Sequence, residues 1–172
     1  MRTTPIAVPA VLAALLLLAA CGGPDGDDGK PDSSPCSAAT VSMEVGPASI
    51  APAAGDTGEV PVGFTNQSAA CTLDGFPEVL LAGAGDSESL DVPPTEGAKA
   101  QKLTLAKGES ASFTLTYERG PRGDGSFDAE NLRVELPGDS DGRTFRWTYG
   151  PVASDGGGGH KISVGAYQQV GD

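Results

Sequence analysis

Apolar and polar residues alternate along most of the chain beyond residue 36. The pattern is clearest in residues 111–117, ASFTLTY, where every second side chain is apolar. It recurs in residues 41–45, 60–64, 132–136, 145–149 and 162–164. Because successive side chains of a strand point to opposite faces, a period of two is typical of a strand with one buried and one solvated face. We therefore predict that the apolar members face a core: Val41, Met43, Val45, Val60, Val62, Phe64, Ala111, Phe113, Leu115, Tyr117, Leu132, Val134, Leu136, Phe145, Trp147, Tyr149, Ile162 and Val164.

Turn residues separate these segments, and no segment shows the period of an amphipathic helix. Shorter apolar runs at residues 79–81 and 103–105 are further strand candidates. Such a chain is typical of an all-β fold, and we predict an immunoglobulin-like antiparallel β-sandwich of about seven to eight strands in residues 36–172. Pro61 lacks a backbone N–H inside one predicted strand, so we expect that strand to lie at a sheet edge or to be bulged.

The first twenty residues form a segment of another kind. Arg2 is followed by an apolar run, residues 6–20, which is shorter than the roughly 20 residues needed to span a bilayer. A cationic start, a short apolar stretch and small residues at its end are typical of a secretory signal peptide, which we assign to residues 1–20. The end of the run, LAAC at residues 18–21, resembles the lipobox of bacterial lipoproteins. This resemblance implies cleavage before Cys21, lipidation of its thiol and anchoring at the outer face of the cell membrane. Ordinary secretion with a free Cys21 is the alternative.

Residues 21–35 connect the predicted anchor to the predicted domain. After Cys21 the segment reads GGPDGDDGKPDSSP. This acidic composition, rich in Gly, Pro and Asp, is typical of a disordered linker, because it offers no apolar surface to bury. We expect the linker to hold the domain away from the membrane.

The net charge narrows the choice of partners. The chain carries a net charge of −12 at pH 7. Since Arg2 is the only charged residue of the first twenty, cleavage would leave −13. Such a chain cannot neutralise a phosphate backbone, so we expect no nucleic-acid partner. The expected partners are the membrane, through the lipid on Cys21, and an envelope protein or cell-wall ligand.

Two cysteines follow Cys21. In an oxidising extracytoplasmic compartment the two thiols of one small domain most often pair, so we predict a Cys36–Cys71 disulfide. The chain has no C-x-x-C spacing and a single histidine. We therefore predict no metal site, no redox site and no cofactor.

A longer motif surrounds Cys71. Residues 65–79, TNQSAACTLDGFPEV, resemble the signature TN-x-S-x-x-C-T-L-x-G-[FY]-P-x-V of a domain-of-unknown-function family abundant in lipoproteins and secreted proteins of actinobacteria. Residues 103–111, 132–137 and 161–165 resemble later segments of that family, so the resemblance extends over residues 36–167. It implies a β-sandwich and export, and it implies no chemistry.

The sequence of one loop matches a catalytic motif. Residues 138–142, GDSDG, read G-x-S-x-G, and Asp155 and His160 follow in the order found in some hydrolases. That motif requires a turn between a strand and a helix, whereas Ser140 lies between two predicted strands. Two aspartates flank Ser140, and His160 follows four glycines that offer its ring no support. We therefore assign no catalytic residue and keep a hydrolase using Ser140 and His160 as an alternative.

Two further short motifs have simpler explanations. Asp139 and Asp141 resemble the start of a calcium-binding loop, but the remaining ligands are missing, so we expect a solvated turn. Residues 122–124 spell Arg-Gly-Asp, a tripeptide that arises readily by chance in Gly-rich loops.

These observations favour a non-catalytic binding module of unknown ligand. Loops carry binding on such scaffolds, and the candidate loops are Gly46–Gly58, Gly83–Gly97 and Glu118–Asp128. The alternatives are the extracytoplasmic hydrolase described above and a passive structural lipoprotein of the envelope.

Overall fold

The computed structural model describes residues 34–86, 88–123 and 125–171. The predicted signal peptide, Cys21 and nearly all of the predicted linker lie outside the described residues. Within these ranges no helix is long and apolar enough to span a membrane. The elements are, in chain order, β1 (Val41–Val45), β2 (Thr57–Asn66), β3 (Cys71–Leu73), β4 (Glu78–Ala82), the 3₁₀ turn η1 (Ala84–Asp86), β5 (Ser89–Asp91), β6 (Leu103–Leu105), β7 (Ser110–Glu118), β8 (Ser126–Phe127), β9 (Asn131–Glu135), β10 (Arg143–Arg146), β11 (Val152–Ala153), β12 (Ile162–Val164) and β13 (Gln168–Val170).

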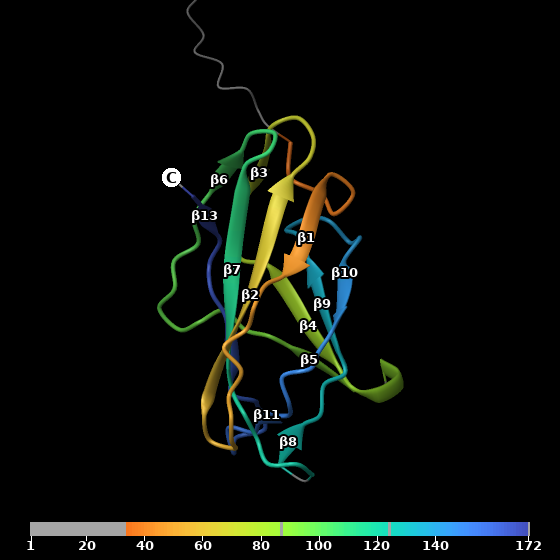
Figure 1. Ribbon diagram of the computed structural model, residues 1–172, viewed down its shortest axis with the longest axis vertical. Helices are drawn as coiled ribbons and strands as arrows, with labels where there is room; N and C mark the ends of the chain where they lie inside the picture. The colour runs from red at the N-terminus through yellow and green to blue at the C-terminus, as the bar shows by residue number, and fades with distance from the viewer. Residues whose placement is uncertain (1–33, 87, 124, 172) are drawn as a thin grey trace, which may run out of the picture. The chain divides into compact units, whose positions relative to one another are not determined.

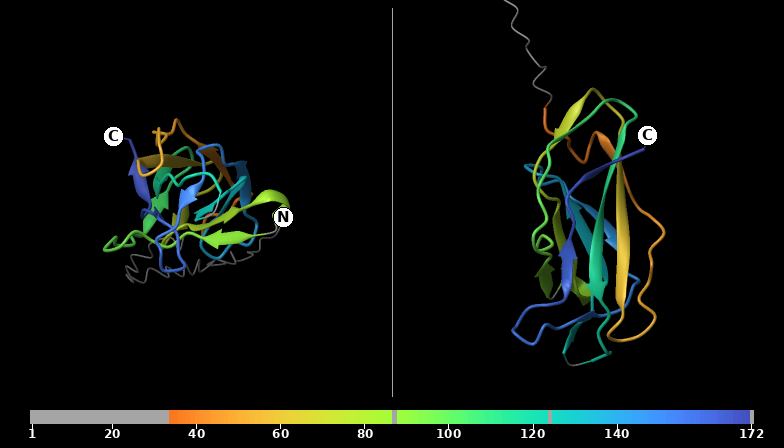
Figure 2. Two further views of the ribbon diagram at one scale, coloured as in Figure 1. Left: turned by 90° about the horizontal axis from the view of Figure 1, so that it is seen from below. Right: turned by 90° about the vertical axis from the view of Figure 1, so that its left-hand side faces the viewer.

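Most strands belong to two antiparallel sheets (Figure 1, Figure 2). The five-stranded sheet has the order β1-β2-β7-β12, with β13 also paired to β7, and the four-stranded sheet has the order β10-β9-β4-β5. In Figure 1 the long strands β2 and β7 lie in front, and β4 crosses behind them. Two short pairs, β3–β6 and β8–β11, lie at opposite ends of the sandwich.

This strand order confirms the predicted β-sandwich and refines it. An immunoglobulin constant domain packs strands A-B-E-D against C-F-G. Here β1, β2 and β7 take the positions of A, B and E, and β4, β9 and β10 take those of C, F and G. The C-terminal strands β12 and β13 occupy the place of D beside β7. The described chain has more strands than the expected seven to eight, because strands such as β8 and β11 are only two residues long and show no alternation in the sequence.

The core lies between the inward faces of the two sheets. All residues of β2, β7 and β9 that we predicted to face inward are buried. Four predicted core residues are only half-buried: Met43 and Val45 of β1, Phe145 of β10, and Tyr149 just beyond it. β1 and β10 are edge strands. Tyr167, between β12 and β13, was absent from the predicted core, yet its ring contacts those of Phe64 and Phe113 at centroid distances of 5.8 and 6.2 Å.

The structure corrects the expectation for Pro61. Its strand, β2, is not an edge strand but lies between β1 and β7, and it pairs with β7 continuously from Thr57 to Thr65. The backbone of Pro61 faces β1, because its carbonyl accepts a hydrogen bond from the Gly46 N–H at 2.9 Å. Since β1 ends at Val45, the N–H that proline lacks would lie at the end of the β1–β2 hydrogen-bond ladder. The β2–β7 ladder therefore loses no hydrogen bond.

The predicted Cys36–Cys71 disulfide is confirmed. Both cysteines belong to the buried core. The Cys36 N–H also donates to the Thr72 carbonyl at 2.9 Å, so the segment that enters the domain is held against β3 by covalent and hydrogen bonds. The buried side chain of Asn66 braces the turn before β3 and joins it to β6, because its amide donates to the Ala69 and Leu105 carbonyls, each at 2.9 Å. The motif around Cys71 therefore stabilises this end of the sandwich.

Candidate functional site

The residues of the hydrolase alternative are not brought together. Ser140 lies in the connection between β9 and β10, whereas His160 forms a bridge with Ser154 directly after β11. These connections lie at opposite ends of the sandwich (Figure 1). The hydrogen bond of about 3 Å between nucleophile and base, which this alternative requires, is therefore not formed.

His160 is held in place, contrary to the expectation from the four glycines before it. Asp155 accepts hydrogen bonds from the backbone N–H groups of Gly157 and Gly159 at 2.7 and 2.9 Å. These bonds order the glycine loop and lower the pKa of Asp155 below its ordinary value of 3.8. The imidazole packs edge-on against the ring of Phe127. Its Nδ1 is buried and has no hydrogen-bond partner among the described residues.

Asp139 bonds to the backbone in the loop that contains Ser140. Its carboxylate accepts hydrogen bonds from the N–H groups of Asp141 at 3.0 Å and Ala38 at 2.7 Å. These bonds, the first in particular, lower the pKa of Asp139 below 3.8. The carboxylate thereby joins the β9–β10 turn to the segment before β1. In the part of the chain that the structure describes, no three or more His, Cys, Asp or Glu side chains are grouped to hold a metal ion.

The three candidate loops are largely tied to the sandwich. In the loop between β1 and β2, Ala51 is fully buried and its carbonyl accepts a hydrogen bond from Arg119 Nη1 at 2.8 Å. The second loop contains β5, a strand of the four-stranded sheet. The third contains β8, which pairs with β11. Asp124 of the Arg-Gly-Asp sequence lies outside the described residues. These loops therefore present short, braced turns.

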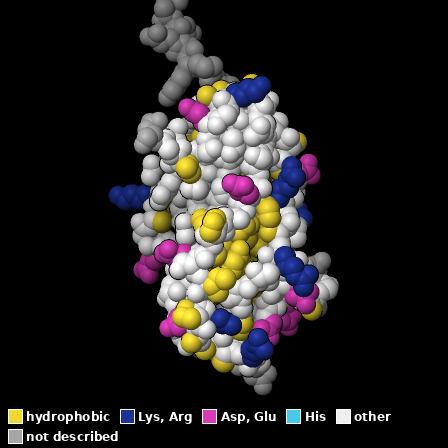
Figure 3. Space-filling view, in the orientation of Figure 1, with side chains coloured by type: hydrophobic (Ala, Val, Ile, Leu, Met, Phe, Trp, Pro, Cys, Tyr) yellow, Lys and Arg dark blue, Asp and Glu magenta, His cyan; other side chains and the backbone are white. Residues whose placement is uncertain are grey.

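An apolar stripe runs diagonally across the face shown in Figure 3. It follows the side on which the edge strands β1 and β10 lie next to each other (Figure 1). Half-buried residues of these strands, such as Met43, Val45 and Phe145, pack against the core. The stripe is therefore the rim of the core that two open sheet edges leave partly uncovered.

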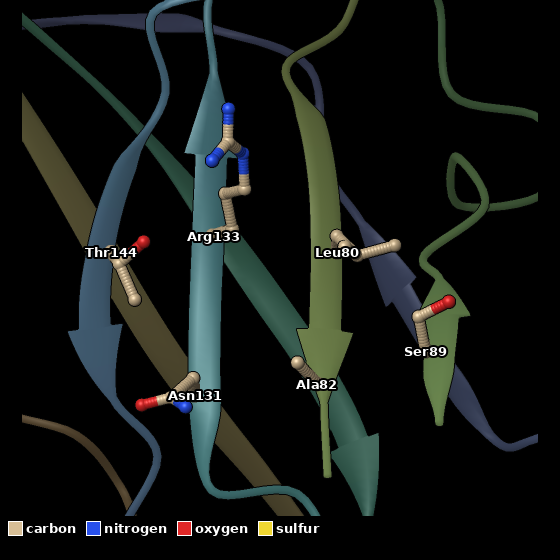
Figure 4. A pocket seen from close by; sticks show the side chains of 6 residues that line it. All are labelled: Leu80, Ala82, Ser89, Asn131, Arg133 and Thr144. Carbon is tan, nitrogen blue, oxygen red and sulfur yellow. The ribbon is translucent and has the colours of Figure 1, made fainter. Parts of the chain in front are cut away.

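A hollow lies on the outward face of the four-stranded sheet. Its volume is about 450 Å³, and it is lined by Leu80 and Ala82 of β4, Ser89 of β5, Asn131 and Arg133 of β9, and Thr144 of β10 (Figure 4). Along β4 and β9 these residues alternate with Leu81, Leu132 and Val134, which belong to the core. Ser89, Ala82 and Asn131 stand in one cross-strand row. Because their side chains are short, they leave space beside Leu80 and Arg133.

A smaller hollow of about 240 Å³ continues past Arg133, and the two together are the sheet groove. Glu78, Asp91 and Glu135 line this second part. Arg133 Nε donates to a carboxylate oxygen of Glu135, which forms an ion pair. Glu78 and Asp91 are exposed, and neither forms an ion pair with a described residue. The sheet groove therefore has a neutral polar half and an acidic half, with Arg133 at their boundary.

The sequence did not lead to the sheet groove. The alternation in residues 131–135 does mark Asn131 and Arg133 as outward-facing. The hollow, however, depends on which residues stand beside them, and Leu80 and Ala82 reach β9 only through the sheet order. No local signal in residues 78–82 indicates that β4 pairs with β9.

Comparisons with known proteins provide a family assignment. Residues 36–168 match the family described as Domain of unknown function (DUF4232). No curated protein and no solved structure matches the chain.

Proposed function

This chain belongs to the DUF4232 family, and we propose that it is an exported, membrane-anchored lipoprotein whose β-sandwich is a non-catalytic binding module. The start of the sequence supports export and anchoring, because a short apolar run ends in the lipobox-like sequence LAAC at Cys21. The Cys36–Cys71 disulfide supports an extracytoplasmic location, because disulfides persist in oxidising compartments.

The sheet groove is the observation that most directly supports a binding role. Its larger hollow, about 450 Å³, has the size of many ligand pockets, which run from roughly 300 to 1,000 Å³. An arginine, an asparagine and two hydroxyl groups surround the apolar Leu80 and Ala82. Such a combination of an apolar floor with a few polar groups is typical of sites that orient a ligand. The side chains stand on paired strands, so the sheet ladder fixes their positions.

The binding role is tested by placing the same substitution on each outward face. Ser89→Arg puts a long side chain into the sheet groove, and Ser42→Arg puts it on the exposed outward face of β1. We expect in-cell crosslinking followed by mass spectrometry to show that Ser89→Arg loses partners that the unchanged chain and Ser42→Arg both retain. Equal capture by all three chains would contradict binding through the groove and favour a passive envelope protein.

The anchoring role is tested at Cys21. Cys21→Ser removes the thiol that the lipobox resemblance marks for lipidation. We expect the unchanged chain to sediment with membranes and to incorporate a radiolabelled fatty acid, and we expect the variant to do neither. Fatty-acid labelling that persists in the variant would contradict lipidation at this position.

A further inference from the structure

On the basis of the binding role proposed above, we propose that the sheet groove binds short zwitterionic peptides. Glu78 and Asp91 hold the ammonium group, and Arg133 holds the carboxylate. The charges of the groove, the free donors of its arginine and the strand register all support this ligand class.

The acidic half of the groove contains three carboxylates and a single arginine. Glu78 and Glu135 stand directly opposite each other on β4 and β9, and like charges in such a cross-strand pair repel. Arg133 forms an ion pair with Glu135, and among the described residues no cation pairs with Glu78. Asp91, opposite Leu80 on β5, is likewise without a cation. An ammonium group between Glu78 and Asp91 supplies the charge that this half lacks.

Arg133 keeps hydrogen-bond donors for an anionic group. A guanidinium has five N–H donors, of which one on Nε points to Glu135 and one on Nη2 to the Ser140 carbonyl at 3.1 Å. These two contacts orient the side chain, which is still 40% exposed. The remaining donors have no partner among the described residues, and a carboxylate is the acceptor that the planar guanidinium binds best. Arg146, opposite Asn131 in register, adds a second positive charge on this side of the sheet.

The register sets the length of the ligand. Residues two apart along a strand are separated by about 7 Å. Asp91 stands in the same cross-strand row as Arg133, two strands and about 10 Å away across the sheet. The row of Glu78 lies about 7 Å from the row of Arg133 and about 14 Å from the row of Arg146. The terminal charges of an extended tripeptide are about 10 Å apart, which falls between these two values.

The neutral half of the groove suits a peptide backbone. The hydroxyl groups of Ser89 and Thr144 and the side-chain amide of Asn131 line the hollow, and such groups both donate and accept hydrogen bonds. Ala82 is the smallest side chain of the lining and leaves room for a methyl group on the ligand. We therefore choose alanine peptides as probes.

A ligand with only one of the two charges fits less well. An anion alone approaches Arg133 beside Glu78, Asp91 and Glu135, on a protein of net charge −12. A cation alone leaves the free donors of Arg133 unpaired. Both charges on one molecule satisfy the two halves together.

The experiment uses four forms of tri-alanine: with free termini, N-acetylated, C-amidated, and with both ends blocked. Each is titrated into the ¹⁵N-labelled full-length protein while the amide signals are followed by NMR. We expect the free peptide to shift the amide signals of β4, β9 and β10, and each singly blocked form to bind about tenfold more weakly, the equivalent of ~1.4 kcal/mol. Equal affinity of the free and doubly blocked forms would overturn the proposal.

Two variants separate recognition of the charges from a general loss of structure. Arg133→Gln should remove the difference in affinity between the free and the C-amidated peptide and keep the difference between the free and the N-acetylated one. Glu78→Gln should do the reverse. Glu44→Gln, on the outward face of β1, is the matched control and should leave every affinity unchanged. A uniform weakening of all four peptides by Arg133→Gln would contradict a contact with the carboxylate.

The experiments distinguish a wrong ligand class from a wrong binding face. If no form of tri-alanine binds but Ser89→Arg still removes crosslinked partners, zwitterionic peptides are the wrong class and the sheet groove remains the binding face. If the peptides do not bind and Ser89→Arg captures the same partners as the unchanged chain, both proposals are overturned.

Discussion

The two sheets bury similar apolar faces, but their outward faces differ. On the five-stranded sheet several polar groups bind one another: the hydroxyl groups of Thr65 and Ser110 lie 2.9 Å apart, and Lys161 pairs with Glu118 at 2.8 Å. Glu44 and Glu59 of this face are exposed and form no ion pair with a described residue. A broad depression of about 400 Å³ on this face contains that same ion pair. On that side one acid, Glu96, lines the depression without an ion pair to a described residue. On the four-stranded sheet two such acids, Glu78 and Asp91, line a hollow that also contains Arg133, whose guanidinium keeps free donors.

This difference shows where the molecule is suited to a ligand. Groups that already bind each other gain little from a ligand, because the new contact must replace an existing one. Exposed charges without a protein partner give up only bound water to a ligand, so each such contact has a modest net gain. The upper part of the view in Figure 3, over β2 and β7, is largely white, since hydroxyl side chains and glycine dominate the outward face there. The two faces thus differ in arrangement: among the described residues, only the hollow of the four-stranded sheet brings two unpaired acids together with an arginine that keeps free donors.

The largest expected effect is on the free energy of unfolding, and it differs between the inward and the outward side of β9. Leu132 is fully buried and Arg133, its neighbour on β9, faces outward. Leu132→Ala should lower the free energy of unfolding by about 2–5 kcal/mol, because it leaves a cavity in the core. Arg133→Gln should change it by less than about 1 kcal/mol, because its ion pair is partly exposed. Urea denaturation of both variants measures the contrast, and equal losses would show that Arg133 supports the fold as much as a core residue does.

Removal of the disulfide should cost slightly less and should spare the sheet groove. Cys36→Ala together with Cys71→Ala opens a covalent loop with a sequence separation of 35 residues. We expect the free energy of unfolding to fall by about 2–4 kcal/mol, because the unfolded chain regains conformational freedom. Tri-alanine titration below the unfolding transition should give an unchanged affinity. A loss of affinity in the folded variant would mean that the disulfide also shapes the groove.

Two buried tyrosines provide a smaller contrast within the core. The Tyr117 hydroxyl donates to the Tyr149 carbonyl at 2.9 Å, whereas the buried hydroxyl of Tyr167 has no partner among the described residues. Tyr117→Phe should therefore lower the free energy of unfolding by about 1 kcal/mol, and Tyr167→Phe should leave it unchanged or raise it. Burial raises the pKa of Tyr167, so its phenol should stay protonated in the folded state at alkaline pH. Thermal unfolding of the two variants, with ultraviolet titration of the tyrosines, provides the check.

The smallest expected effect is on the stability of the protein at acidic pH. Backbone hydrogen bonds lower the pKa of Asp139 below 3.8 in the folded state. A group with a lowered folded pKa stabilises the protein above its unfolded pKa, and this contribution is lost as the pH falls through the folded pKa. Asp139→Asn should therefore weaken the loss of stability on acidification, followed as the urea midpoint between neutral pH and pH ~3. Asp141→Asn is the matched control, because no hydrogen bond to the Asp141 carboxylate is present among the described residues, and an identical response of both variants would contradict this role of Asp139.

The sequence predicts the inward face of the sandwich much better than the outward one. Burial can be read from the local sequence, because nearly all inward residues of β2, β7 and β9 are apolar, and the apolar positions were predicted correctly. The buried Asn66 at the end of β2 is a polar exception that the alternation did not reveal. Tyr167 was missed because it enters the core from the break between β12 and β13, where no alternation exists. The disulfide was predicted because only two cysteines remain after Cys21.

The sheet groove could not be predicted because it is a property of neighbouring strands. Arg133 and Glu135 are recognisable as outward-facing from β9 alone. Their surroundings come from β4, β5 and β10, and the register between these strands follows from packing rather than from a local motif. Pro61 illustrates the same point. Its nitrogen faces the end of β1 and not β7, and this arrangement, which the sequence does not reveal, allows a proline in a central strand.

The most direct measurement compares contacts made by the two outward faces in cells. A photo-crosslinking amino acid replaces Thr144 in the sheet groove of one chain and Ser42 on the other face of a second chain, both of which are exposed positions. We predict a specific adduct from position 144 and none from position 42. Adducts from position 42 alone, or the same adducts from both positions, would contradict the assignment of binding to the four-stranded sheet.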